Sequence, residues 1–138
     1  MKVNLKRIDD AYYMEASNED GNLTYTDGSP AIGGGNQAMR PMQMVLAAAG
    51  SCSSIDVIMI LKKQKEPLDD IQITVEGERH MDRTPKTFKK IHIHYKLFGD
   101  LNEKKAKRAI ELSMEKYCSV SIMLKATVEI TYSYEIIR

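Results

Sequence analysis

Residues 41–63 read PMQMVLAAAGSCSSIDVIMILKK, and this stretch decides the fold. Proline suits the first turn of a helix because it has no amide proton to leave unsatisfied, so we predict one helix from Pro41 to Lys63. Its apolar residues lie on most of its surface rather than on a single stripe. Such a helix needs cover on several sides, and one small sheet does not supply it. A homodimer would.

Strands and shorter helices flank this central helix. The last strand, over residues 127–136, alternates apolar or aromatic with polar residues, as half-buried strands do. Asn102 is a suitable cap for an amphipathic helix that runs to about Lys116. The other expected elements are strands at 3–8, 11–17, 23–26, 71–78 and 89–98 and a helical segment at 120–125. This order predicts an α+β fold, an antiparallel sheet with a long central helix, in a single domain over residues 1–138.

Charge and composition narrow the possible partners. The chain carries 20 basic and 19 acidic residues, a formal net charge of +1, which gives no reason to expect nucleic acid or an anionic membrane as a partner. The N-terminal residues contain no continuous apolar stretch of signal-peptide length, and no run of about 18 apolar residues occurs. We therefore expect a cytoplasmic protein, in a compartment where a permanent structural disulfide is uncommon.

The chain has two cysteines, Cys52 in the central helix and Cys118 in the break between the later helical segments. In a reducing compartment such a pair is inert core, a metal site or a redox pair. Cys52 lies too far into its helix to gain from the N-terminal dipole, so an arginine or a similar donor would have to stabilise its thiolate. Cys118 comes just before Ser119, where free backbone amides can reach a thiolate. These features alone leave the inert and the reactive interpretations open for both thiols.

Other kinds of site lack their usual patterns. The two cysteines with His80, His92 and His94 could supply four metal ligands, but the paired ligands at short spacing that mark structural zinc are missing. His92 and His94 instead fall on the polar face of their strand. The segment GSCS at 50–53 is not the GxSxG of a nucleophile elbow. The glycine-rich loop at 27–37 lacks the lysine of a phosphate-binding loop. We expect neither a metal nor a cofactor.

Two motifs resemble those of a known family. Residues 40–57, RPMQMVLAAAGSCSSIDV, resemble the central-helix signature of the OsmC/Ohr family, in which a proline-led apolar helix runs into A-x-x-x-C. Residues 118–126, CSVSIMLKA, resemble its second hallmark, a cysteine followed by x-V-S and then L-K-A before a closing strand. Residues 84–91, TPKTFKKI, followed by Gly99, are similar to the branch known as OsmC-like redox proteins. The resemblance covers nearly the whole chain from Arg40.

This resemblance implies an intertwined homodimer with active sites at the subunit interface. It also implies that the Cys52 thiolate attacks the O–O bond of an organic hydroperoxide and becomes a sulfenic acid, which Cys118 resolves to a disulfide. A dithiol reductant, lipoyl-type in the best-known relatives, then restores both thiols. In the family a glutamate shortly after the helix-starting proline orients the activating arginine. This chain has Met42 and Gln43 there.

Two points stay open in the sequence: which arginine activates Cys52, and whether the protein binds an apolar ligand. Arg40 is the nearest candidate for the activating arginine and Arg7 is another, while a solvated arginine at a helix start is equally compatible with the sequence. The alternative function is the binding of an apolar small molecule or lipid, with weak or redox-sensing thiol chemistry. Met42, Met44 and Met59 would line that interface pocket, because methionine adapts to irregular apolar shapes. Plain core filling is the other interpretation of these methionines.

Overall fold

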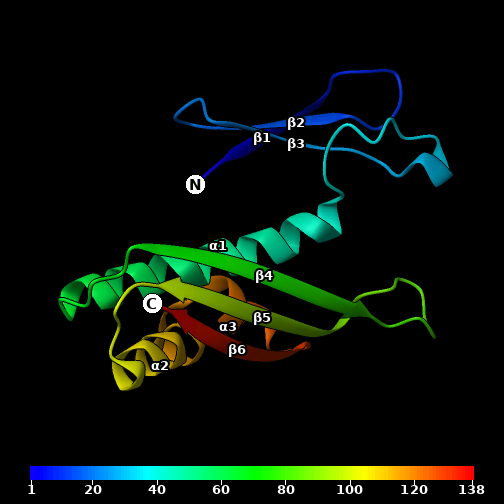
Figure 1. The fold of residues 1–138 in the computed structure, drawn as a ribbon. Coiled ribbons are helices and arrows are strands. Elements are labelled where there is room, and N and C mark those ends of the chain that lie inside the picture. The colour runs from blue at the N-terminus through cyan, green and yellow to red at the C-terminus, as the bar shows by residue number, and fades with distance from the viewer. The chain divides into compact units, whose positions relative to one another are not determined.

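The computed structural model describes all 138 residues, which form two compact units, Met1–Val45 and Leu46–Arg138 (Figure 1). The single domain expected over residues 1–138 stays a prediction, and each unit is described by itself. The helix α1 (Pro41–Lys63) begins in the first unit and continues into the second. Its bounds are those predicted from the sequence.

The first unit contains an antiparallel meander of three strands. The carboxylate of Asp9 accepts the backbone N–H groups of Ala11 and Tyr13. This turn occupies the residues where we expected the second strand to begin, so that strand starts only at Met14. Gly21 takes a φ of 81° in the next turn, a conformation that favours glycine. The strands are β1 (Val3–Arg7), β2 (Met14–Asn18) and β3 (Leu23–Thr26).

A loop organised by one buried carboxylate follows β3. The two oxygens of Asp27 accept the backbone N–H groups of Gly28 and Gln37, at 2.7 and 3.0 Å. The 3₁₀ turn η1 (Pro30–Ile32) lies between these two contacts. The glycine-rich segment at 27–37 is therefore held at both ends by the same side chain.

The second unit is a three-stranded sheet with helices against one face, behind the sheet in the view of Figure 1. It contains most of α1, then β4 (Asp70–Arg79), β5 (Phe88–Phe98), α2 (Glu103–Leu112), the π-helical turn η2 (Ser113–Tyr117), α3 (Ser119–Leu124) and β6 (Glu129–Ile137). The α+β class with a long central helix is confirmed. The helix expected to run to about Lys116 is divided at Ser113, where η2 begins.

The strand order is β4-β5-β6, and the pairing differs in one place from the antiparallel sheet that we expected. The strands β4 and β5 are antiparallel, but β5 and β6 are parallel. Parallel neighbours need a long crossover connection, and α2, η2 and α3 supply it. Because these helices lie on the same face as α1, the crossover also closes the core.

The core lies between this sheet and α1. Four inward side chains of β5 are fully buried: Ile91, Ile93, Tyr95 and Leu97. Burial of each aliphatic one stabilises the folded state by about 1.5–3 kcal/mol. The helix passes close to the sheet at Gly50 of α1, where an added Cβ would lie 2.8 Å from the Val75 side chain of β4. Such close packing fixes the rotation of α1, and with it the direction in which its polar side chains point.

One face of α1 has no cover within the second unit. By length and composition alone the helix would also suit a membrane span, but Val57 and Leu61 are fully buried against the sheet unit. On the opposite side Ile55, Ile58 and Met59 are exposed. The helix is therefore a core helix on one side and an unpartnered apolar surface on the other.

Candidate functional site

The second unit brings the two cysteines together. The Sγ atoms of Cys52 and Cys118 and a carboxylate oxygen of Asp56 all lie within 4.8 Å of one another. Cys52 and Asp56 are four residues apart on α1 and so share a face, while Cys118 immediately precedes α3. Both cysteines are free thiols; Cys52 is half-buried and Cys118 is fully buried. Two sulfurs this close, one of them accessible, can exchange between dithiol and disulfide with modest movement.

Cys118 is the cap of α3, which agrees with its expected place beside free backbone amides. The backbone N–H of Ser121 donates to the Cys118 Sγ at 3.4 Å, and the Ser121 hydroxyl lies 3.1 Å from the same sulfur. Burial raises the pKa of the Cys118 thiol, and the neighbouring Cys52 acts in the same direction, while the Ser121 contacts oppose the rise without reversing it. Cys118 is therefore a thiol rather than a thiolate at neutral pH.

Asp56 is held by a buried network of hydroxyl groups. The Ser113 hydroxyl donates to Asp56 Oδ2 at 3.1 Å and lies 2.9 Å from the Ser53 hydroxyl, which in turn pairs with Tyr95. Burial raises the pKa of Tyr95 to about 12, so its hydroxyl stays protonated. Sequence reasoning missed Asp56 as a site residue. The only signal was its spacing of four residues from Cys52.

A groove of about 620 Å³ opens beside Asp56. Most of its lining is apolar, with Lys63 as the one cation. Of the methionines expected in a pocket, Met59 lines this groove, whereas Met42 and Met44 belong to the first unit. The lining residues are Asp56, Met59, Ile60, Lys63, Gln64, Leu112 and Tyr117.

Arg40 lies in the first unit, and its contacts are local. Its guanidinium donates to the Ala38 carbonyl and to Asn36 Oδ1, both at 2.6 Å. Its backbone N–H donates to Gln43 Oε1 at 2.9 Å, the reciprocal contact of a helix-capping box. Gln43 therefore serves the start of α1 and does not orient the guanidinium. The activating role of Arg40 stays a prediction, as does that of Arg7 on β1.

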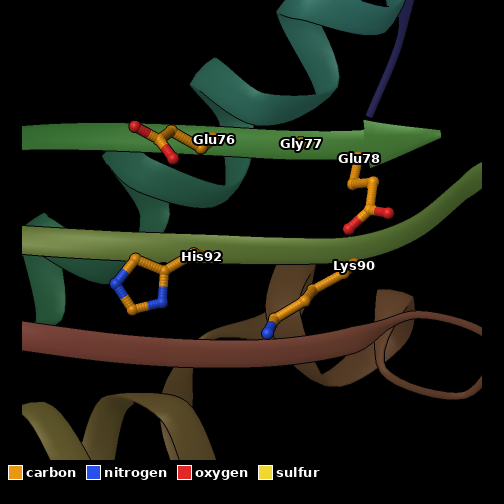
Figure 2. Close-up of a pocket in the computed structure, with 5 residues that line it drawn as sticks. All are labelled: Glu76, Gly77, Glu78, Lys90 and His92. Carbon is orange, nitrogen blue, oxygen red and sulfur yellow. The ribbon is translucent and has the colours of Figure 1, made fainter.

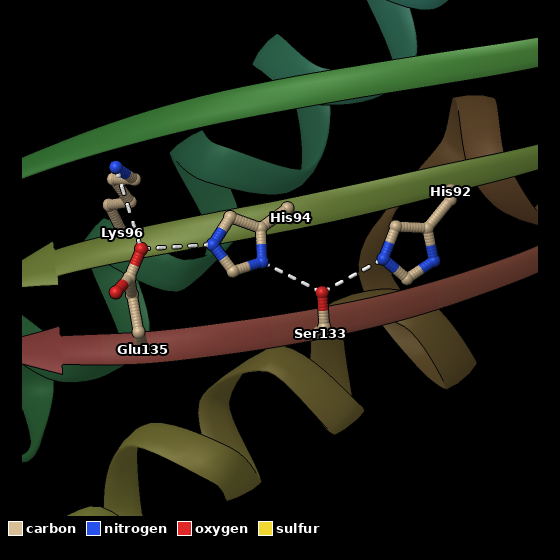
Figure 3. Close-up of polar contacts among 5 residues, drawn as sticks. All are labelled: His92, His94, Lys96, Ser133 and Glu135. Atoms are coloured by element: carbon tan, nitrogen blue, oxygen red, sulfur yellow. Dashed lines mark hydrogen bonds and ion pairs between the residues drawn. The ribbon is translucent and has the colours of Figure 1, made fainter.

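The two strand histidines lie on the polar face of the sheet, as predicted. Figure 3 shows the Ser133 hydroxyl between the rings, 2.8 Å from His92 Nε2 and 2.7 Å from His94 Nδ1. The other nitrogen of His94 bonds to Glu135 at 3.2 Å, and Lys96 lies 3.5 Å from the same carboxylate. These ring nitrogens bond to side chains of the neighbouring strand β6, and the rings lie on the face of the sheet opposite the helices that carry the cysteines.

A shallow hollow lies on this same polar face. Figure 2 shows it between β4 and β5, with Glu76 and Glu78 on one strand and Lys90 and His92 on the other. Glu76 lies opposite His92 and Glu78 opposite Lys90, with Gly77 between the two glutamates on β4. Neither cysteine lines the hollow. It is a feature of the solvated sheet surface, separate from the thiol site.

Taken together, a long helix packed on a sheet and two thiols within 4.8 Å define a two-cysteine thiol protein of the α+β class. The family model described as OsmC-like protein matches residues 33–133, so the chain belongs to the OsmC-like family. The resemblance inferred from the two cysteine motifs is confirmed.

Relatives and solved structures agree with this assignment. The chain is 44% identical over 104 residues to protein YhfA of Escherichia coli K12, a match that covers 75% of this chain and 77% of YhfA. A hypothetical protein from Aquifex aeolicus VF5 has 31% identity and a TM-score of 0.81, covering 99% of this chain and 97% of that one. An organic hydroperoxide resistance protein OsmC from Legionella pneumophila has a TM-score of 0.72 at 21% identity, covering 98% and 97%. At that identity the likeness shows the fold alone.

Proposed function

We propose that this protein reduces organic hydroperoxides with the thiols of Cys52 and Cys118. The observation that carries the proposal is the presence of two free thiols within 4.8 Å of each other, one half-buried and one fully buried. Cys52 is the accessible member and meets the peroxide. Cys118 needs access only to Cys52, and burial raises the pKa of its thiol.

The thiols of Cys52 and Cys118 together supply the two electrons that reduce one hydroperoxide to an alcohol and water. The Cys52 thiolate attacks the outer oxygen of the hydroperoxide, an S–O bond forms as the O–O bond breaks, and Cys52 becomes a sulfenic acid. The alkoxide takes a proton from water and leaves as the alcohol. The Cys118 sulfur then attacks Cys52 Sγ, the S–O bond breaks, and the hydroxide leaves as water with the Cys118 proton. An external dithiol of the lipoyl type returns two electrons by thiol–disulfide exchange.

The groove beside Asp56 supports an organic substrate. Its volume of about 620 Å³ and its apolar lining suit the hydrocarbon part of a hydroperoxide better than hydrogen peroxide. The same groove favours a second candidate, the binding of an apolar ligand without turnover. A lipid that co-purifies in native mass spectrometry, together with thiols that do not react with peroxide, would favour that second function.

A second copy of the chain is proposed to cover the exposed apolar face. Ile55 on α1 is 57% exposed, Met59 64% and Met123 on α3 70%, and large exposed apolar side chains at a protein surface often mark interfaces. We therefore expect a homodimer. We also propose that the protein is cytoplasmic and that Arg40 supplies the cation that stabilises the Cys52 thiolate. Sedimentation equilibrium at micromolar concentration should give the mass of two chains. A mass of one chain would contradict the dimer.

Thiol counting tests the activity itself. Reduced protein treated with one equivalent of cumene hydroperoxide should lose both thiols per chain and yield one equivalent of the alcohol. Hydrogen peroxide should react at least about tenfold more slowly, because it cannot use the apolar groove. The proposal fails if both thiols survive the organic peroxide.

A further inference from the structure

We infer that the reduced protein binds a thiophilic divalent cation of the zinc type through Cys52, Asp56 and Cys118. This site goes beyond the proposed peroxide chemistry and does not depend on it, since it needs only three donor atoms. Those atoms lie within 4.8 Å of one another. The expectation of no metal rested on the spacing of cysteines and histidines, whereas the fold adds a carboxylate that no spacing rule includes.

The geometry is close to that of a tetrahedral site. Zinc bonds of about 2.3 Å to sulfur and 2.0–2.2 Å to oxygen place the sulfurs about 3.8 Å apart and each sulfur about 3.5 Å from the oxygen. Separations of at most 4.8 Å therefore need to close by only about 1 Å. Two ligands come from one turn of α1 and the third from the residue before α3. Three protein ligands leave a fourth position for water, as in zinc sites that remain reactive.

The charges also favour a cation. The carboxylate of Asp56 lies within 4.8 Å of both sulfurs, so the three groups in their negatively charged ligand forms would repel one another. A divalent cation converts this repulsion into attraction, because all three ligands bind in their negative forms. The metal site thus gives Asp56 a function that the thiol chemistry does not.

Neighbouring groups already orient the ligands. The Ser113 hydroxyl donates to Asp56 Oδ2 at 3.1 Å, which leaves the other carboxylate oxygen for the metal. The Ser121 N–H donates to Cys118 Sγ at 3.4 Å, a contact that also stabilises a metal-bound thiolate. Asp56 further lines the groove, which gives an ion a path from solvent.

The metal and the oxidant would compete. A bound cation uses the same sulfur electron pairs as a disulfide, so the metal-bound and oxidised states exclude each other. Zinc would therefore protect Cys52 from hydroperoxide, and oxidation of the pair would release the ion.

Cobalt titration tests the site without any peroxide. Reduced, metal-free protein is titrated anaerobically with Co²⁺, whose thiolate charge-transfer absorption reports cysteine ligation, and Zn²⁺ is then added. We expect one Co²⁺ per chain, displaced by stoichiometric zinc. Cys52→Ser and Cys118→Ser should each lose about half of the absorption, since each removes one of two sulfur ligands. Asp56→Asn should keep the absorption but weaken binding at least about tenfold.

The control variant His92→Gln/His94→Gln removes two of the three histidines and should bind like the wild type. The site is overturned if excess Co²⁺ gives no thiolate absorption, or if binding is lost in the histidine variant and retained in the cysteine variants. A second readout needs only the wild type. One equivalent of Zn²⁺ should slow alkylation of Cys52 by iodoacetamide at least about tenfold, and an unchanged rate refutes the site.

Discussion

Replacing Cys52 with serine is expected to lower the rate of organic hydroperoxide reduction by at least about three orders of magnitude. A serine hydroxyl is not ionised near neutral pH, whereas the thiolate is the species that attacks the O–O bond. Cys52 is the half-buried member of the thiol pair, and the fully buried Cys118 is shielded from the substrate. The rate is measured as loss of cumene hydroperoxide with a dithiol in excess.

Ser51→Ala is the matched control for this variant. Ser51 precedes Cys52 on α1, is exposed, and its hydroxyl makes only a weak contact of 3.4 Å with the Ala48 carbonyl. Its rate should equal that of the wild type. If Cys52→Ser keeps a rate within about tenfold of the wild type while circular dichroism shows an unchanged fold, another group performs the chemistry.

The central helix could be predicted from the sequence because its ends carry strong local signals. Pro41 begins α1 and no other element competes for its long apolar run, so the predicted and observed bounds agree. The pairing of the last strand could not be predicted in this way. Alternation in β6 gives the same pattern whether the neighbour runs parallel or antiparallel, and the direction is set by the crossover through α2, η2 and α3.

The site was only partly predictable for a similar reason. The two cysteine motifs predicted that Cys52 and Cys118 belong to one site, and the fold places their sulfur atoms within 4.8 Å of each other. Asp56 gave no motif, because a single carboxylate in an apolar helix is a site residue only when the fold puts a second group opposite it. The interruption at Ser113 was also missed. The Ser113 hydroxyl bonds to that of Ser53 from a distant part of the chain, a contact that no local pattern contains.

Replacing Cys118 with serine is expected to separate the two chemical steps. The first step should persist, because Cys52 remains, so one equivalent of hydroperoxide oxidises it and the sulfenic acid accumulates. Turnover with a dithiol should fall by at least about a hundredfold, since the intramolecular disulfide no longer forms at the high effective concentration of a neighbouring thiol. Dimedone trapping followed by mass spectrometry should find the adduct on Cys52 in this variant and little of it in the wild type.

The fold should tolerate this change, which makes the outcome decisive. Cys118 caps α3 by accepting the Ser121 N–H, and serine is among the residues preferred at that position. A loss of turnover therefore cannot be assigned to an uncapped helix, and Ser119→Ala, an exposed neighbour, controls for local effects. Unchanged turnover in Cys118→Ser would show that the external dithiol reduces the sulfenic acid directly. The proximity of the two sulfurs would then have to be explained by metal binding alone, in which case the cobalt affinity of the variant should still fall.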